Sequence, residues 1–388
     1  MKRRELIKSG LLSVGITALS SDSNSATSQI IEIIPKQTDT YKISCPMPFN
    51  FSEIDKLSEL NSSLKKSKVT TLYNSYPAPL CYAFKGEFQT NRGFNDNIKD
   101  FNDFAKYVRY AQKSGFKFVY TLNNPKPFFN DKFEENKDAL FNLLENLKKT
   151  GCNDLKISNQ QLMEIIDNQT NFKFNFHVST SSEYHNICQY TNLINSYPNI
   201  KSINISIDDN RNFELLQNLR KKYPNIDLEI ILNESCVYGC PSRISHPSTF
   251  FKYFDCISYC DKIGKIDYFF KSNMIYPWQL EYFSAIGINN FKFVFFDRGS
   301  NSYSQSIKPY LMCVENGTDE LFAKDFFYSV MSMRGDEKLK ENVKLSDIKP
   351  YFPEMKYFVK NGNMCSSICG IECNYCMECA KKVKKMVL

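Results

Sequence analysis

The feature that most constrains the fold is a regular alternation, from residue 69 onward, of short β-rich runs with longer amphipathic runs. Eight runs rich in β-branched and aromatic residues predict strands at 69–73, 117–123, 154–158, 173–179, 202–207, 227–233, 266–271 and 291–297. Helical periodicity predicts helices at 98–114, 134–150, 159–168, 182–196, 211–222, 248–262, 278–286 and 318–333. Strands that alternate with helices pair in parallel, and eight such units predict an α/β fold, a (β/α)8 TIM-like barrel.

Chemistry in a barrel of this type sits at the carboxyl ends of its strands. The predicted ends carry polar pairs, which are Asn123-Asn124, Ser158-Asn159, Ser179-Thr180, Asp208-Asp209, Asn233-Glu234 and Asp297-Arg298. The strand predicted at 227–233 runs almost directly into Cys236. A cysteine cluster is therefore expected at the functional mouth of the barrel.

The first 40 residues do not follow the barrel pattern. They join a charged start containing Arg3-Arg4 to an apolar stretch, Leu11 to Leu19, and then to a Ser- and Asn-rich exit. This resembles a twin-arginine signal and predicts export to the periplasm, the alternative being an extension that stays in the cytoplasm. We expect a signal or extension at 1–40, a barrel domain at 41–340 and a Cys-rich segment at 341–388.

Two further features limit the class of protein. The apolar stretch near the start is too short to span a bilayer, so no membrane span is expected after signal removal. The net charge of +7 is concentrated partly in a lysine-rich tail at 381–385. No basic stripe with interleaved aromatic residues accompanies this tail, so nucleic acid is not favoured as a partner.

Nine of the 14 cysteines fall in two tight groups. The first group has the spacing Cys236-x3-Cys240-x15-Cys256-x3-Cys260. Four thiolates in two close pairs can converge on one metal centre, and soft thiolate ligands select iron–sulfur clusters or zinc. The spacing favours an iron–sulfur cluster, with zinc or disulfides as alternatives, because paired cysteines of zinc knuckles usually have two residues between them.

The second group has five cysteines close together near the C-terminus, at Cys365, Cys369, Cys373, Cys376 and Cys379. It contains Cys369-x3-Cys373-x-Tyr375-Cys376, which has the spacing of a radical-SAM signature. In radical-SAM proteins, however, that signature follows the first strand of the barrel. Here the motif follows the last predicted strand. A second iron–sulfur cluster or a zinc site is the preferred interpretation.

The stretch from Leu232 to His246, which reads LNESCVYGCPSRISH, resembles the Asn-Glu-x-Cys-x3-Cys-Pro-x-Arg-x2-His segment of the collagenase-like peptidase family, peptidase U32. Residues 71–75, 118–124 and 275–298 resemble other strand ends of that family. One departure is Tyr276, which stands where the family has an arginine before Pro277.

This resemblance implies an iron–sulfur cluster, of the 4Fe-4S type, held by the first four cysteines. It also implies redox tailoring of a small molecule, by oxygen-independent hydroxylation-type chemistry, with a paralogous subunit or an electron donor as partner. The alternatives are a non-catalytic iron–sulfur accessory or electron-transfer subunit, and a peptidase as the family name suggests.

Three residues near these motifs are candidates for catalysis. Glu234 and His246 flank the cysteine ligands and are suited to proton transfer, although His246 fits equally well as a hydrogen-bonding support for the cluster. Arg298 follows the last predicted strand and is suited to an anionic substrate group. Neither a His-Glu-x-x-His nor a Gly-x-Ser-x-Gly motif occurs, which weighs against a peptidase.

Overall fold

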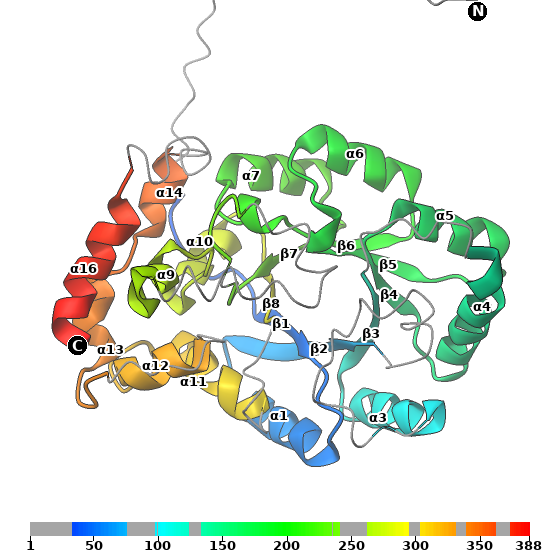
Figure 1. Ribbon diagram of the computed structural model, residues 1–388, viewed down its shortest axis with the longest axis horizontal. Coiled ribbons are helices and arrows are strands. Elements are labelled where there is room, and N and C mark those ends of the chain that lie inside the picture. The colour runs from blue at the N-terminus through cyan, green and yellow to red at the C-terminus, as the bar shows by residue number, and fades with distance from the viewer. Residues whose placement is uncertain are drawn as a thin grey trace, which may run out of the picture. The chain divides into compact units, whose positions relative to one another are not determined.

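Eight parallel strands close a barrel in sequential order, β1 to β8, as the TIM-like prediction requires (Figure 1). The computed structural model describes residues 33–75, 98, 100–123, 133–234, 236–240, 262–294, 303–330, 339–361 and 373–388. The strands are β1 (Tyr41–Pro46), β2 (Ser67–Asn74), β3 (Lys117–Leu122), β4 (Asp154–Ile157), β5 (Asn175–Val178), β6 (Ile200–Asn204), β7 (Asp227–Ile231) and β8 (Asn290–Lys292).

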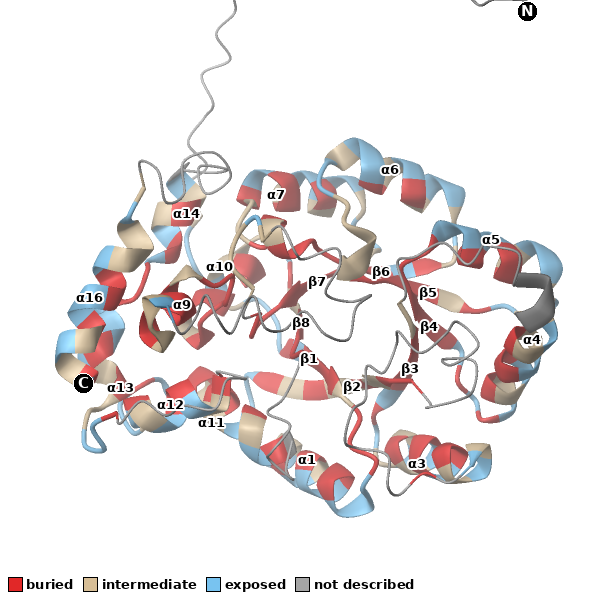
Figure 2. Cartoon of the chain, viewed as in Figure 1, coloured by how far each residue is buried: buried red, intermediate tan, exposed pale blue. Residues whose placement is uncertain are grey.

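Helices surround the barrel and turn their apolar sides toward it (Figure 2). Those before β8 are α1 (Phe51–Ser63), α3 (Phe101–Lys113), α4 (Phe133–Lys149), α5 (Gln160–Gln169), α6 (Ile187–Ser196), α7 (Phe213–Lys222), α9 (Lys265–Lys271) and α10 (Leu280–Ala285). Those after it are α11 (Tyr303–Asn316), α12 (Ala323–Val330), α13 (Leu345–Ile348), α14 (Met355–Asn361) and α16 (Tyr375–Val387). Short 3-10 turns lie at Thr180–Ser182, Ile207–Asp209, Pro277–Gln279 and Lys349–Tyr351.

Local sequence signals explain where several helices begin. Asp100 caps α3 by accepting the N–H of Asp103, and Asn159 caps α5 by accepting the N–H of Gln161. Asn186 opens α6 with a reciprocal capping box. These caps satisfy N–H groups that the first helical turn leaves without partners, so the chain leaves each strand end in a defined direction.

One predicted strand is wrong. The apolar run at 266–271 forms most of α9, whose Ile266, Tyr268, Phe269 and Phe270 are all buried. Short apolar runs do not distinguish a buried helix from a buried strand, because both are apolar on every side. The eighth strand is instead β1, which begins at Tyr41 and pairs with both β2 and β8.

The helix predictions hold unevenly. The predictions within 98–222 agree with α3 to α7, and 278–286 agrees with α10. Among the described residues of the helix predicted at 318–333, Ala323–Val330 is helical and the helix begins later than predicted; α1 and α11 were not predicted. The helix predicted at 248–262 falls almost entirely outside the described residues.

The C-terminal helix is packed onto the rest of the fold. Helix α16 lies against α9, and Lys384 of α16 forms an ion pair with the buried carboxylate of Asp267. Ala380, Val383 and Val387 belong to the same apolar core as the barrel. Within the described part of the chain, no helix is long and apolar enough to cross a membrane. The three-part division at residues 40 and 340 stays a prediction.

Candidate functional site

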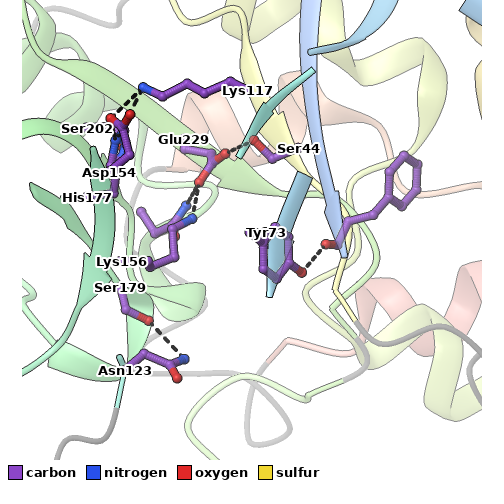
Figure 3. Close-up of polar contacts among 12 residues, drawn as sticks. Ser44, Tyr73, Lys117, Asn123, Asp154, Lys156, His177, Ser179, Ser202 and Glu229 are labelled. Atoms are coloured by element: carbon purple, nitrogen blue, oxygen red, sulfur yellow. Dashed lines mark hydrogen bonds and ion pairs between the residues drawn. The ribbon is translucent and has the colours of Figure 1, made fainter. Parts of the chain in front are cut away.

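The inside of the barrel is polar and charged, whereas barrels of this type are usually filled by branched aliphatic side chains. Alternate strand residues face the lumen, and in β4 to β8 many of these are polar. They are Asp154, Lys156, Asn175, His177, Ser202, Asn204, Glu229 and Lys292, and Figure 3 shows several of them with their contacts. Because a buried polar group is costly unless it is satisfied, this composition indicates a site.

Glu229 of β7 is the centre of the first group of polar contacts in the lumen. Its Oε1 accepts a hydrogen bond from the Ser44 hydroxyl at 2.5 Å. Its Oε2 accepts from the Lys156 amino group at 2.8 Å and from the Asn204 side-chain amide. Although burial opposes ionisation, the positive charges of Lys156 and Lys292 lower the pKa of Glu229 to about 2. The carboxylate is therefore ionised and bound by three donors.

A second lysine shares the lumen with this ion pair. The Lys292 amino group of β8 lies 4.1 Å from the centre of the Tyr73 ring, and the Lys156 amino group lies 5.3 Å from the same ring. Burial, and then the charge of Lys156, lowers the pKa of Lys292 well below its ordinary value. The carboxylate of Glu234 acts on Lys292 in the opposite direction.

A second polar group lies toward the amino ends of β3, β4 and β5. His177 Nε2 is 2.8 Å from Asp154 Oδ1, and His177 Nδ1 is 2.7 Å from the Ser202 hydroxyl. Lys117 also pairs with Asp154, at 2.8 Å. Burial lowers the pKa of His177, although Asp154 opposes the shift. The imidazole is consequently neutral near pH 7 and bridges a carboxylate and a hydroxyl.

Hydroxyl groups gather at the carboxyl ends of β3, β4 and β5. The Ser158 and Ser181 hydroxyls both donate to the backbone carbonyl of Asn123, each at 3.0 Å. Asn123 also donates its side-chain amide to Ser179 at 3.5 Å. On the opposite side, Ile207, Ile231 and Val294 form a small separate apolar cluster. The carboxyl end of the lumen thus has one polar side and one apolar side.

The first cysteine pair lies on a turn directly after β7. The backbone N–H of Cys236 donates to Glu234 Oε1 at 2.8 Å, and the Cys236 carbonyl accepts from the N–H of Asn273 at 3.1 Å. Gly239 has φ of +60°, which favours glycine, and its N–H donates to Asp208 at 3.1 Å. Cys236 and Cys240 are half-buried on this anchored turn.

Other polar residues of these loops hold the backbone in place. Asn233 clamps β7 to the end of β8, because its side chain donates to the Val294 carbonyl at 2.6 Å and accepts from the Val294 N–H at 2.8 Å. Arg211 donates to the Met274 carbonyl and lies 4.3 Å over the Phe358 ring. Neither Asp208 nor Arg211 caps α7, because Asn212 fills that role.

The described part of the second cysteine group lies at the start of α16. The Cys373 thiol is 3.4 Å from the Tyr357 hydroxyl, and the Tyr357 ring stacks on Tyr375 at 4.1 Å. Cys376 and Cys379 follow within the first turns of the helix. Both thiols act electrostatically on the buried Tyr276 hydroxyl, whose pKa is raised mainly by burial. Cys376 and Cys379 therefore lie on the side of α16 that is near Tyr276.

Several predicted site residues lie outside the described part of the chain. These are His246, Cys256, Cys260, Arg298, Cys365 and Cys369. Within the described residues, no group of three or more His, Cys, Asp or Glu side chains could hold a metal ion. Of the first four predicted ligands, the structure describes Cys236 and Cys240.

Sequence reasoning missed the lumen residues. The signal was present, because parallel strands buried on both faces usually read as continuous apolar runs. Here β4 reads DLKI, β5 reads NFHV and β7 reads DLEII, which alternate polar with apolar residues. In a barrel covered by helices, the outward-facing side chains of each strand pack against the helices. The polar side chains of such a strand therefore face the lumen.

No family model matches the chain. The chain is 23% identical over 348 residues to a protein of Methanocaldococcus jannaschii described as an uncharacterized protease, a match that covers 86% of this chain and 94% of that protein.

Similar solved structures include the U32 peptidase Mk0906, with a TM-score of 0.40, 9% identity and coverage of 68% of this chain and 95% of that one. Another is CdNal from Clostridium difficile in complex with mannosamine, with a TM-score of 0.37, 10% identity and coverage of 90% and 100%. The fold and site define a (β/α)8 barrel protein with a polar lumen and a cysteine turn at its mouth.

Proposed function

We propose that this U32-type protein binds an iron–sulfur cluster through Cys236, Cys240, Cys256 and Cys260, and that it modifies a small molecule by redox chemistry. The observation that carries the proposal is the cysteine turn anchored directly after β7, the strand that also places Glu229 in the polar lumen. Strand β7 therefore connects the cysteine turn with the charged interior of the barrel.

The described donors suit such a group. Thiolates are the usual ligands of iron–sulfur clusters, and half-buried thiols are partly sheltered from solvent, which helps a cluster persist. Cys236 and Cys240 meet both conditions. A bound cluster would supply one-electron transfer. Glu234 is a positioning residue in this proposal, because it fixes the Cys236 N–H and acts on the charge of Lys292.

A polar lumen favours an enzyme over an accessory electron carrier. A carrier requires only an exposed cluster on a filled barrel, whereas a substrate requires polar groups arranged inside. Glu229, Lys156, Lys292 and the hydroxyls of Ser158 and Ser181 supply such groups. The second cysteine group, from Cys365 to Cys379, is proposed to hold a second cluster or zinc, and export by the twin-arginine route is proposed for the full chain.

The test is anaerobic purification of the full chain, followed by its visible spectrum and its iron and sulfide content. We expect a brown protein that loses its colour and iron in Cys236→Ala. Cys188→Ala is the matched control, since Cys188 is exposed on α6 and should leave colour and iron unchanged. A colourless wild type that holds zinc or no metal would refute the proposal.

The second cysteine group needs its own variant. Cys376→Ala should remove part of the iron if this group holds a cluster, and should remove zinc alone if it holds zinc. Unchanged metal content in Cys376→Ala, in a protein that Cys236→Ala bleaches, would show that the first group alone binds metal.

Peptide hydrolysis is a second candidate, because the Methanocaldococcus relative is described as a protease. The observation that favours it is the chain of contacts from Asp154 through His177 to the Ser202 hydroxyl, which has the residue types of a hydrolytic triad. All three are buried at the amino ends of the strands, away from the usual barrel mouth. Labelling by a fluorophosphonate that is lost in Ser202→Ala would favour hydrolysis.

A further inference from the structure

Two amino groups inside the barrel compete for one carboxylate. Lys156 extends from β4 and forms an ion pair with Glu229 at 2.8 Å. Lys292 extends from β8, and its amino group lies over the Tyr73 ring at 4.1 Å, with the Lys156 amino group 5.3 Å from the same ring. Among the described residues, Lys292 forms no salt bridge.

The carboxylate has little capacity left for Lys292. Glu229 already accepts hydrogen bonds from Ser44, Lys156 and Asn204. Two adjacent ammonium groups repel each other strongly at low dielectric, so the arrangement is most stable when one of them gives up its proton. Because Lys156 is the partner bound to the carboxylate, Lys292 is the one that becomes a neutral amine.

The groups that face Lys292 from the neighbouring strands act in both directions, and burial decides between them. Lys156 on β4 opposes its charge, Glu229 on β7 and Glu234 after β7 favour it, and Tyr73 on β2 presents a ring face. Burial is the largest influence and lowers the pKa of Lys292, with Lys156 adding to the shift. A buried lysine beside a second cationic group is a common way for proteins to make a nucleophilic amine at neutral pH.

We propose that Lys292 is a catalytic amine that forms an imine with a small aldehyde or ketone in the barrel lumen. The Lys292 nitrogen bonds to the carbonyl carbon, and the Lys156 ammonium gives a proton to the carbonyl oxygen and recovers one from the new C–N nitrogen. Lys156 then protonates the carbinol hydroxyl, which leaves as water. The products are a protonated imine on Lys292, a neutral Lys156 amine and one water molecule.

Other side chains of the lumen suit a small carbonyl ligand. The Thr121 hydroxyl and the Asn204 Oδ1 are buried and have no hydrogen-bond partner among the described residues. Both are suited to hydroxyl or amide groups of a ligand, since buried polar atoms are normally satisfied. Ile231 and Val294, two positions beyond Glu229 and Lys292, supply the apolar side. The site therefore fits a compact molecule with one carbonyl and a few hydroxyl groups.

The test traps the imine chemically in the full-length protein. Wild type is incubated at pH 7 with acetaldehyde or pyruvate and sodium cyanoborohydride, which reduces the C=N bond to a stable secondary amine. Peptide mass spectrometry then locates the adducts. A surface lysine with a pKa of about 10.4 is neutral in only about one molecule in 2,500 at pH 7. We expect Lys292 to be labelled at least about tenfold faster than any exposed lysine.

Matched variants separate this chemistry from general labelling. Lys292→Met should abolish the lumen adduct, and Lys156→Gln should slow it, because the neighbouring cation and proton donor are gone. Lys201→Arg, at an exposed position, should change nothing at Lys292. Wild type in which Lys292 is labelled no faster than exposed lysines, or in which Lys156 carries the adduct instead, would overturn the assignment.

The inference is independent of the iron–sulfur proposal. Cys236→Ala, which is expected to lose metal, should keep its Lys292 adduct, because no cysteine takes part in imine formation. Loss of colour with retained labelling would separate the two sites. Labelled Lys292 in a wild type that never binds metal would leave the amine assignment in place while refuting the cluster.

Discussion

Replacement of Glu229 by glutamine tests whether the charged lumen is held together by this one carboxylate. Glu229→Gln keeps the shape of the side chain but leaves the Lys156 ammonium buried without its ion-pair partner at 2.8 Å. Removing one member of a buried pair typically costs about 3–5 kcal/mol of unfolding free energy. The charges of Lys156 and Lys292 lower the pKa of Glu229 to about 2, which agrees with this direction.

The assay is urea unfolding at pH 7, followed by far-UV circular dichroism and by the fluorescence of Trp278, the single tryptophan. Glu145→Gln is the matched control, because Glu145 pairs with Lys149 at the same 2.8 Å but on an exposed helix surface. That control should cost about 0–1 kcal/mol. Equal losses in the two variants would refute the claim that burial makes the Glu229 pair different.

The double variant and pH dependence sharpen the test. Adding Lys156→Met to Glu229→Gln should recover much of the loss, since an apolar side chain needs no counter-charge. The folded pKa of Glu229 is depressed, so its stabilising contribution is present above its unfolded pKa of about 4.5 and is lost as pH falls toward about 2. Wild type should therefore lose stability below pH 4.5 more steeply than Glu229→Gln.

Three further predictions concern other parts of the site. Asn233→Ala should cost about 1–3 kcal/mol, because it leaves both the N–H and the carbonyl of Val294 without their side-chain partner, as urea unfolding would measure. In an NMR titration His185 should keep its proton to about pH 10, because the hydrogen bonds that it donates to the carboxylates of Asp209 and Glu183 raise its pKa, and titration below pH 8 would contradict this contact. His177 should stay neutral through pH 7 in the same spectra, and a charged His177 would contradict the burial argument.

The sequence was sufficient for the repeated β/α pattern and for most of its helices. Strand β1 was not predicted, because its six residues end at Pro46 and precede the first clear β-rich run. The strand predicted at 266–271 failed because four of its six residues are large and apolar, and so short a run is also compatible with a buried helix. Both errors concern segments that are too short for their hydrophobic periodicity to distinguish a strand from a helix.

The lumen network was beyond sequence reasoning for a physical reason. Polar alternation in β4, β5 and β7 predicts that polar side chains share a face, but not which of them meet across the barrel. That pairing depends on strand stagger, and the register shifts between Ile43 and Ser44 and between Phe176 and His177. The Ser44 contact with Glu229 follows directly from the stagger of β1, which closes the barrel against β8.

Charge connects the lumen with the cysteine turn. Glu234 accepts the Cys236 N–H at one end and acts on the Lys292 amine at the other. Imine formation would turn a neutral Lys292 into a cation while Lys156 becomes neutral, so positive charge moves from β4 to β8. That shift strengthens the attraction between β8 and Glu234 and lessens the carboxylate's negative field at the turn.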